Sequence, residues 1–284
     1  MSIRLLNGLS DIAADYDALV CDVWGVVHDG HHAHDAACDA LRRFRQSRGP
    51  VVLLTNAPRV PAAVQDQFKG IGVPPDCYDV IVSSGGACRA ELARRSASGT
   101  LPLYYIGSDR DLSIFQGLDI RLSPLDEARA ALCTGLRDDD TEVPGDYGPE
   151  LAAMAARGLT MLCANPDLVV HRGKRLYWCA GALARDYAAL GGDIIYYGKP
   201  HRPVYDMARA EIAARHGGDA KKMLAIGDGM PTDIKGANAE GLDVLFIADG
   251  IHGEEVEPYT PTHVTALLAR GGCHAMAALR ALTW

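Results

Sequence analysis

Short apolar runs alternate with helix-like segments along almost the whole chain, and this alternation constrains the fold more than any other feature. The runs with the length and composition of strands are 18–22, 50–55, 79–83, 102–106, 131–134, 160–164, 193–197, 222–227 and 243–247. Several of them are apolar at every position, which is typical of strands covered on both faces. Helix-like segments lie near 34–48, 60–70, 86–97, 109–117, 148–157, 180–190, 202–216, 231–240 and 274–282. The pattern predicts an α/β protein with a mostly parallel sheet.

The composition is that of a globular protein and argues against several classes of partner. Of the 284 residues, 48% are hydrophobic and 23% are charged, and the net charge of −8 disfavours nucleic acids and anionic membranes as partners. No apolar run approaches the roughly 18 residues that a membrane-spanning helix needs. The eight cysteines form no CxxC pair, and the N-terminus lacks the features of a signal peptide. We therefore expect a cytoplasmic protein with reduced thiols.

Polar residues follow several of the predicted strands. Asp22, Thr55, Asn56, Lys199 and Asp228 each stand at or just after the end of an apolar run. Because ligands bind at the carboxyl ends of strands in a parallel sheet, we expect these side chains to share one site. A carboxylate, a hydroxyl and an ammonium suit phosphoryl transfer, in which cations neutralise the phosphate oxygens while the carboxylate attacks phosphorus.

Acidic residues in two of these segments point to a divalent cation. Asp22 closes an apolar run, and Asp228 and Asp233 lie in Gly227-Asp228-Gly229-Met230-Pro231-Thr232-Asp233. Burying carboxylates costs free energy unless a cation balances them, and no arginine stands beside either segment. The plainer alternative is that Asp228 and Asp233 only cap the helix that follows them.

These motifs together resemble the haloacid dehalogenase superfamily, specifically its class IIA hydrolases. The segments that carry the resemblance are Asp22-Val23-Trp24-Gly25-Val26, Leu53-Leu54-Thr55-Asn56, Tyr197-Gly198-Lys199-Pro200 and Gly227-Asp228-Gly229-Met230-Pro231-Thr232-Asp233-Ile234-Lys235-Gly236-Ala237. The last two are highly specific in combination, and the resemblance covers nearly the whole chain. It implies a Rossmann-like parallel-sheet core at 1–85 and 196–284, with an inserted α/β cap domain of the C2 type at 86–195.

The resemblance also implies a Mg²⁺ site. Asp22 would be one ligand, the backbone carbonyl of Trp24 a second and Asp228 a third. Asp233 would bind the ion or hold one of its waters. A set of six oxygen ligands that includes water molecules suits Mg²⁺.

Roles in catalysis follow from the same resemblance. Asp22 would be the nucleophile that forms an aspartyl-phosphate. The hydroxyl of Thr55 and the amide of Asn56 would hold phosphate oxygens, and Lys199 would neutralise both Asp22 and the phosphate. The implied substrate is a small phosphorylated metabolite, either a sugar phosphate or a nucleotide-like phosphate monoester. Caps of this class often pair, which suggests a homodimer.

Trp24 departs from the pattern of the family's phosphatases, which carry a second aspartate two residues after the nucleophile. That aspartate protonates the leaving alcohol and then activates water, whereas the indole N–H of tryptophan does not titrate. Loss of such an acid is worth roughly 10²–10⁴ in rate. An aromatic residue here also resembles the dehalogenase branch, since a halide needs no proton. Two alternatives therefore stay open: a dehalogenase-like hydrolase, and a weakly active or non-catalytic protein that binds a phosphate ligand.

Two further polar clusters have simpler interpretations. His28, His31, His32 and His34 resemble part of a zinc site, but the chain lacks a second ligand pair at suitable spacing, so a polar loop is expected. His28 is also the nearest titratable residue that could replace the missing acid. The segment Asn165-Pro166-Asp167 in the cap would either face the substrate or simply form a turn.

Overall fold

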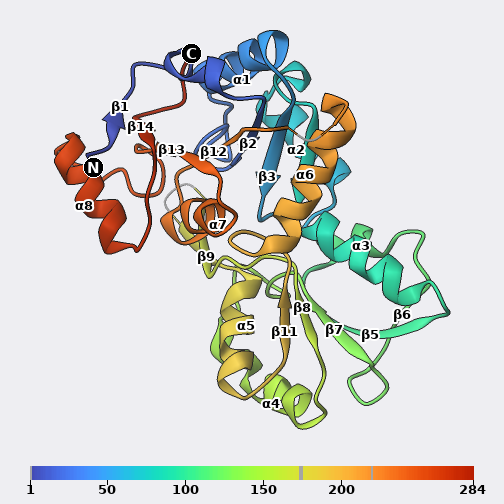
Figure 1. Cartoon of the computed structure of the whole chain (residues 1–284). Helices are drawn as coiled ribbons and strands as arrows, with labels where there is room; N and C mark the ends of the chain where they lie inside the picture. The colour runs from blue at the N-terminus through green and yellow to red at the C-terminus, as the bar shows by residue number, and fades with distance from the viewer. Residues whose placement is uncertain (1, 173–174, 219) are drawn as a thin grey trace. The chain divides into compact units, whose positions relative to one another are not determined.

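The computed structural model describes residues 2–172, 175–218 and 220–284, and the chain forms two compact units. The first, which we call the core unit, consists of Met1–Thr55, Gln65–Val82 and Lys199–Trp284. The second, the cap unit, consists of Asn56–Val64 and Ser83–Gly198. Each unit contains its own parallel sheet (Figure 1), which confirms the expected fold class.

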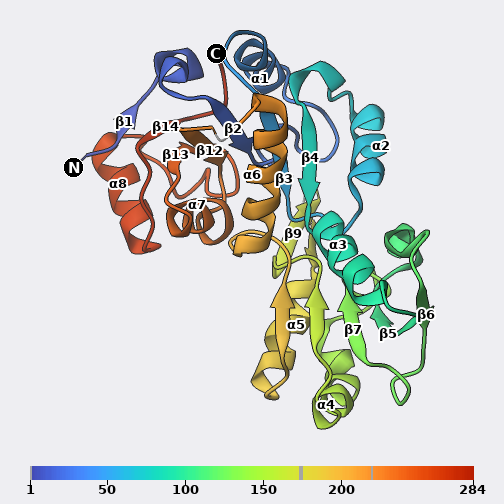
Figure 2. The same cartoon turned by 45° about the vertical axis from the view of Figure 1, so that its right-hand side comes forward.

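The core unit is built on a seven-stranded sheet in the order β1-β14-β13-β12-β2-β3-β4, with β4 at the edge beside β3 (Figure 2). Its strands are β1 Arg4–Leu5, β2 Ala18–Cys21, β3 Val51–Thr55, β4 Val80–Ser83, β12 Met223–Gly227, β13 Asp243–Ile247 and β14 Ala277–Leu279. Every residue of β2 and β3 is buried, as their unbroken apolar sequences predict. The pairings from β1 to β3 are parallel, so β2, β3 and β12 end at the same edge of the sheet.

Helices connect these strands and cover the sheet. They are α1 Asp35–Ser47, α2 Pro61–Ile71, α6 Arg202–His216, α7 Lys235–Ala239 and α8 Pro261–Arg270. Val244 and Phe246, alternate residues of β13, pack with Ala237 of α7 and Leu267 of α8 in one hydrophobic cluster. This packing fixes the strand next to β12, which leads into Asp228.

The cap unit has a five-stranded sheet in the order β11-β8-β7-β5-β6, and all of its pairings are parallel. Its strands are β5 Leu101–Ile106, β6 Ile120–Leu122, β7 Ala130–Cys133, β8 Met161–Cys163 and β11 Ile194–Tyr196. Polar residues follow these strands too, with Ser108 after β5, Thr134 after β7 and Asn165 after β8. The cap sheet therefore has a polar carboxyl edge like that of the core sheet.

Among the described residues, three α-helices and an antiparallel pair of strands complete the cap unit. They are α3 Ser84–Ser96, α4 Gly148–Ala156, α5 Ala180–Ala189 and the antiparallel pair β9 Val169–Arg172 and β10 Arg175–Trp178. Leu151 and Met154 of α4 pack with Leu183 and Tyr187 of α5 against buried residues of β7 and β8. The cap unit thus has a hydrophobic core of its own.

The structure differs from the sequence-based expectations most clearly near the C-terminus. The helix expected at 274–282 is wrong, because Ala277–Leu279 form β14 and pair in parallel with β13. Alanine and leucine favour helix by intrinsic propensity, but pairing with a buried neighbouring strand decides their conformation here. The helix expected at 109–117 is a 3-10 segment, Asp109–Phe115. Over the described part of the chain, no helix has both the length and the hydropathy of a membrane span.

Candidate active site

The register of two adjacent core strands brings distant acidic segments together. Cys21 of β2 pairs with Ile226 of β12, and the backbone N–H of Asp22 donates to the Ile226 carbonyl at 2.8 Å. Asp22 therefore lies beside Gly227, one residue before Asp228. Because the strands are parallel, both carboxyl ends meet at one point of the sheet edge.

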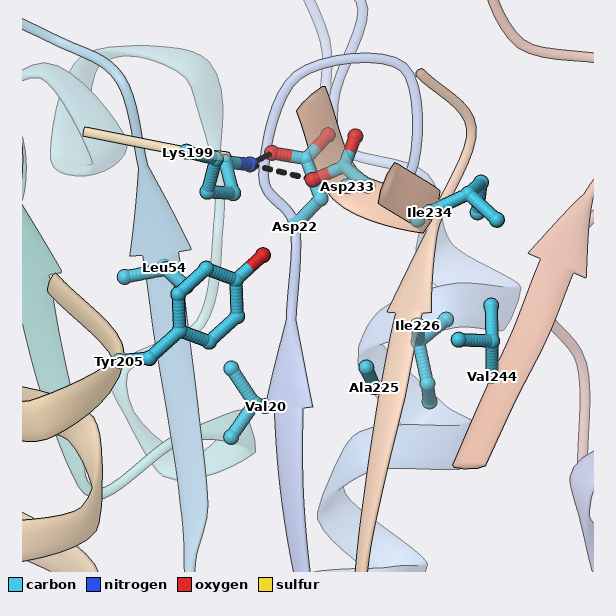
Figure 3. Close-up of a pocket in the computed structure, with 11 residues that line it drawn as sticks. Val20, Asp22, Leu54, Lys199, Tyr205, Ala225, Ile226, Asp233, Ile234 and Val244 are labelled. Carbon is cyan, nitrogen blue, oxygen red and sulfur yellow. Dashed lines mark hydrogen bonds and ion pairs between the residues drawn. The ribbon is translucent and has the colours of Figure 1, made fainter. Parts of the chain in front are cut away.

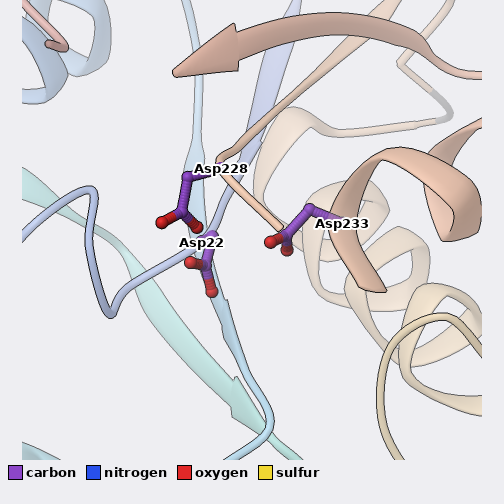
Figure 4. Close-up of side chains that lie close together, drawn as sticks. All are labelled: Asp22, Asp228 and Asp233. Carbon is purple, nitrogen blue, oxygen red and sulfur yellow. The ribbon is translucent and has the colours of Figure 1, made fainter. Parts of the chain in front are cut away.

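Asp22, Asp228 and Asp233 converge at this point (Figure 4). All three are buried, and one carboxylate oxygen of each lies within 4.8 Å of the others. Asp233 arrives from Met230–Ile234, a single π-helical turn of the kind that is frequent at functional sites. Within residues 2–172, 175–218 and 220–284, no other group of histidine, cysteine or acidic side chains has this spacing.

Glycines make room for Asp228. A Cβ on Gly25 would lie 2.4 Å from Asp228 Oδ2, and a Cβ on Gly250 would lie 2.0 Å from the same oxygen. Gly25 has a φ of +82°, a left-handed conformation that glycine adopts without strain. The backbone N–H of Ile251 donates to Asp228 Oδ2 at 2.7 Å, so the loop after β13 orients this carboxylate. No role was expected for that loop from the sequence, although its polar residues also follow a predicted strand.

Lys199 supplies the positive charge of the cluster. Its ammonium contacts Asp22 Oδ1 and lies 2.6 Å from Asp233 Oδ1. The residue is only 4% exposed, so both ion pairs are shielded from water. Burial alone would lower the pKa of Lys199, but the carboxylates of Asp22 and Asp233 outweigh burial and raise it, which keeps the lysine charged.

The acids outnumber this ammonium, and the pKa values of Asp22 and Asp228 reflect the imbalance. Burial and the charge of Asp233 raise the pKa of Asp22 well above its ordinary value. The same two causes raise the pKa of Asp228 to about 6. Because like charges repel strongly in a buried site, this cluster favours a divalent cation that offsets the repulsion.

Thr55 and Asn56 lie at the end of β3. Thr55 is the buried last residue of that strand, and Asn56 belongs to the cap unit. The Asn56 amide donates from Nδ2 to Asp167 Oδ1 at 2.8 Å, and the Ser84 hydroxyl donates to Asn56 Oδ1 at 3.4 Å. The turn at Asn165-Pro166-Asp167 thus holds the side chain of Asn56, a contact that nothing in the sequence indicates.

Trp24 packs within its own loop. Its ring lies 5.2 Å from the ring of His28 in an edge-to-face arrangement, and a Cβ on Gly30 would approach the indole to 2.5 Å. His28 also packs on Phe68, and burial lowers the pKa of His28 to about 4. A histidine that is neutral near pH 7 is a poor proton donor, which argues against His28 as the replacement acid. Among the described residues, the histidines of this loop form no metal-binding group.

Comparison with known proteins identifies the family. A family model described as haloacid dehalogenase-like hydrolase matches residues 19–121, and a second, described as HAD-hydrolase-like, matches residues 196–270. A crystal structure of a haloacid dehalogenase-like hydrolase from Brucella suis is 42% identical, with 98% of this chain and 100% of that chain covered and a TM-score of 0.86. The chain belongs to the haloacid dehalogenase-like hydrolases. Its paired parallel sheets and the two matched segments place it in class IIA, as the motifs predicted.

Two further comparisons relate this haloacid dehalogenase-like chain to phosphatases from Mycobacterium tuberculosis. The D-glycerol 3-phosphate phosphatase is 27% identical over 86% of this chain, and the match spans 66% of that protein, just under two thirds of its length. A crystal structure of a glycerol phosphate phosphatase in complex with magnesium is 25% identical, with 88% of this chain and 73% of that chain covered and a TM-score of 0.66.

Proposed function

We propose that this protein is a Mg²⁺-dependent phosphatase that hydrolyses a small phosphorylated metabolite. The observation that carries the proposal is the buried set of carboxylates, Asp22, Asp228 and Asp233, two of which contact the ammonium of Lys199. Family membership supports it, since the curated relative from Mycobacterium tuberculosis is a D-glycerol 3-phosphate phosphatase. The proposed substrates are sugar phosphates and nucleotide-like phosphate monoesters.

The residues present fit a Mg²⁺ ion. Asp22 and Asp228 would bind it through carboxylate oxygens, Trp24 through its backbone carbonyl, and Asp233 directly or through a water. The glycines around Asp228 keep the space beside its carboxylate free of side-chain atoms. When bound, the ion offsets the negative charge of the carboxylates and of the phosphate oxygens.

Asp22 is the proposed nucleophile. Its carboxylate oxygen would attack phosphorus, the bond between phosphorus and the alcohol oxygen would break, and an aspartyl-phosphate would form. Water would then attack the phosphorus of this intermediate, which releases inorganic phosphate and restores the carboxylate. Lys199 would hold Asp22 in place and neutralise phosphate oxygens, while the Thr55 hydroxyl and the Asn56 amide would bind other phosphate oxygens.

Trp24 limits which substrates react fast. The leaving alcohol must take its proton from water, because neither the indole of Trp24 nor a neutral His28 supplies one near pH 7. General acid catalysis contributes roughly 10²–10⁴ in rate, so esters of the more acidic alcohols should react best. The same observation favours a second candidate function, a protein that binds a phosphate ligand and turns it over very slowly.

A panel of phosphate monoesters tests the proposal. The purified protein is assayed for phosphate release from sugar phosphates, nucleoside monophosphates and p-nitrophenyl phosphate, with Mg²⁺ and with EDTA, and for halide release from a 2-haloacid. We expect Mg²⁺-dependent phosphate release that is fastest for the aryl ester, and no halide. Metal-independent halide release would support the dehalogenase-like alternative. Calorimetric binding of a phosphate ligand without turnover would support the binding protein.

Further properties outside the active site are predicted from the sequence. Domain boundaries at 86 and 195, a homodimer and a cytoplasmic location all stay predictions. Gel filtration with light scattering tests the dimer directly.

A further inference from the structure

Tyr205 of α6 places a hydroxyl beneath the buried ion pairs of the core unit. The residue is only 2% exposed. Figure 3 shows its hydroxyl pointing toward Lys199, Asp22 and Asp233. No hydrogen bond joins this hydroxyl to any residue that the structure describes. A hydroxyl inside the fold that has no protein partner costs free energy unless water hydrogen-bonds to it, so its position needs an explanation.

A small cavity separates the hydroxyl from the ion pairs. Tyr205, Asp22, Lys199 and Asp233 line its polar side. Apolar residues form the rest of the wall, among them Val20, Leu54, Ala225, Ile226, Ile234 and Val244. The cavity has room for about one water molecule. A buried water needs two to four hydrogen bonds, and Tyr205, Asp22 and Asp233 are the lining residues that would supply them.

Gly236 is a second sign that the chain accommodates this hydroxyl. A Cβ at position 236 would lie 2.3 Å from the Tyr205 oxygen and 2.8 Å from Pro200 Cα, so no larger residue fits there without displacing them. Gly236 belongs to the segment that carries Asp228 and Asp233. Because Gly236 has no side chain, the oxygen of Tyr205 can lie in the space that a Cβ at position 236 would occupy.

We propose that Tyr205 is a positioning residue that holds one ordered water between its hydroxyl and the carboxylates of Asp22 and Asp233. The water accepts a hydrogen bond from Tyr205 and donates one to each carboxylate. Polar groups separated by more than direct hydrogen-bond distance are commonly joined in this way. This role rests on the proposed phosphatase function, because its purpose is to fix the angle at which Asp22 faces phosphorus.

The hydroxyl is suited to donate to such a water. Burial, together with the charge of Asp233, raises the pKa of Tyr205 above its ordinary value, so the phenol keeps its proton near neutral pH. The water in turn gives each carboxylate a hydrogen bond in addition to its contact with Lys199. Asp233 also accepts a hydrogen bond from the Gly229 N–H at 3.0 Å, so the water adds most to the orientation of Asp22.

Tyr205→Phe tests the role, with Tyr16→Phe as the matched control. Tyr16 is also a buried tyrosine of the core unit, but its hydroxyl donates to Asp243 at 2.9 Å, and Tyr16 precedes β2 whereas Asp22 follows it. We expect Tyr205→Phe to lower kcat about tenfold with KM nearly unchanged, because the water loses the hydroxyl that holds it and the carboxylates of Asp22 and Asp233 lose their hydrogen bonds from that water. Tyr16→Phe should leave kcat unchanged, although both variants should lower Tm. An unchanged kcat in Tyr205→Phe would overturn the inference.

A high-resolution crystal structure gives a readout that needs no activity. We expect density for one water within hydrogen-bond distance of the Tyr205 oxygen in the wild-type protein, and its loss or displacement in Tyr205→Phe. A dry cavity in an active enzyme would overturn the inference and leave the proposed function intact. A bound water in a protein without phosphatase activity would refute the proposed function and keep the water site.

Discussion

The carboxyl edges of the two parallel sheets differ in how their buried charges are balanced. At the core edge three buried carboxylates lie close together, and the ammonium of Lys199 contacts two of them, those of Asp22 and Asp233. At the cap edge, after β5, the fully buried side chain of Asp111 lies 3.4 Å from Arg110 Nε and 3.6 Å from Arg59 Nε. The core edge thus has an excess of buried acid, whereas the acid of the cap edge has arginines beside it.

This difference shows that polar strand ends alone do not mark a reactive site. In the cap, Thr134 after β7 shares a hydrogen bond of 2.9 Å with the Tyr105 hydroxyl, and Asp111 is paired, so both groups serve the fold. In the core, like charges are held together at a cost to stability, which is typical of sites kept for chemistry. Uncompensated charge distinguishes the two edges.

Asp22→Asn should have the largest effect of any change at the core edge. Asparagine keeps the shape of the side chain but cannot act as the nucleophile. We expect phosphate release to fall by roughly 10⁴-fold or more, as it does when other enzymes lose a nucleophile. Steady-state assays on the best ester of the panel, at saturating Mg²⁺, measure it.

Thr134→Val is the matching change at the cap edge. It removes one buried polar group from a strand end, as Asp22→Asn removes one charge. We expect a lower Tm, because the Tyr105 hydroxyl loses a partner, but no fall in kcat. If Asp22→Asn kept wild-type turnover instead, the nucleophile assignment would be wrong and the two edges would not differ in function.

Much of the core edge could be predicted from sequence, because it depends on local patterns. One apolar run ends in Asp22, and a second leads into Asp228. Because parallel strands end at the same edge of a sheet, these two runs are enough to predict that the two acids lie close together. Gly25, which follows Asp22 closely, and Gly227 and Gly229, which flank Asp228, can also be seen in the sequence. The alternation of strands and helices could also be predicted, since β2 and the first four residues of β3 are apolar at every position.

Contacts between distant side chains could not be predicted in this way. The pairing of Asp111 with Arg59, and that of Asn56 with Asp167, join segments far apart in the chain, and no local pattern encodes them. The conformation of Ala277–Leu279 is also set by a neighbouring strand rather than by its own residues. Nothing around Tyr205 in the sequence shows where its hydroxyl points.

Trp24→Asp sharpens the comparison by restoring an acid to the core edge. If the protein is a phosphatase that lacks its general acid, the variant should hydrolyse esters of poorly acidic alcohols about 10–10²-fold faster than wild type. The gain should be small for p-nitrophenyl phosphate, whose leaving group needs no proton. Rates of phosphate release from an alkyl and an aryl ester, compared between the variant and wild type, measure the effect.

Trp24→Phe is the control for this gain. Phenylalanine keeps an aromatic ring beside His28 without adding an acid, so neither ester should react faster. The absence of any gain in Trp24→Asp, with the fold intact, would favour the dehalogenase-like or ligand-binding alternative.

The smallest expected effects concern stability, and their signs should be opposite at the two edges. In EDTA at pH 7.5, Asp228→Asn should raise the free energy of unfolding by on the order of 2 kcal/mol, since it removes one of several buried like charges. The Asn carbonyl can still accept from the Ile251 N–H. Asp111→Asn should lower it by about 1–3 kcal/mol, because Arg59 and Arg110 lose their buried partner. Urea unfolding of Asp228→Asn, Asp111→Asn and the wild-type protein measures both changes in the free energy of unfolding.

The dependence on pH separates charge repulsion from other causes of the Asp228→Asn gain. The folded protein raises the pKa of Asp228 to about 6 through burial and the charge of Asp233, whereas an unfolded aspartate titrates near 3.9. The loss of unfolding free energy that charged Asp228 causes in the wild-type protein is therefore fully present above about pH 6. It shrinks as the pH falls, because folded Asp228 takes up a proton. The gain from Asp228→Asn should follow it and vanish near pH 4. A gain that persists at pH 4, or a loss at pH 7.5 like that of Asp111→Asn, would mean that both edges balance their charges alike.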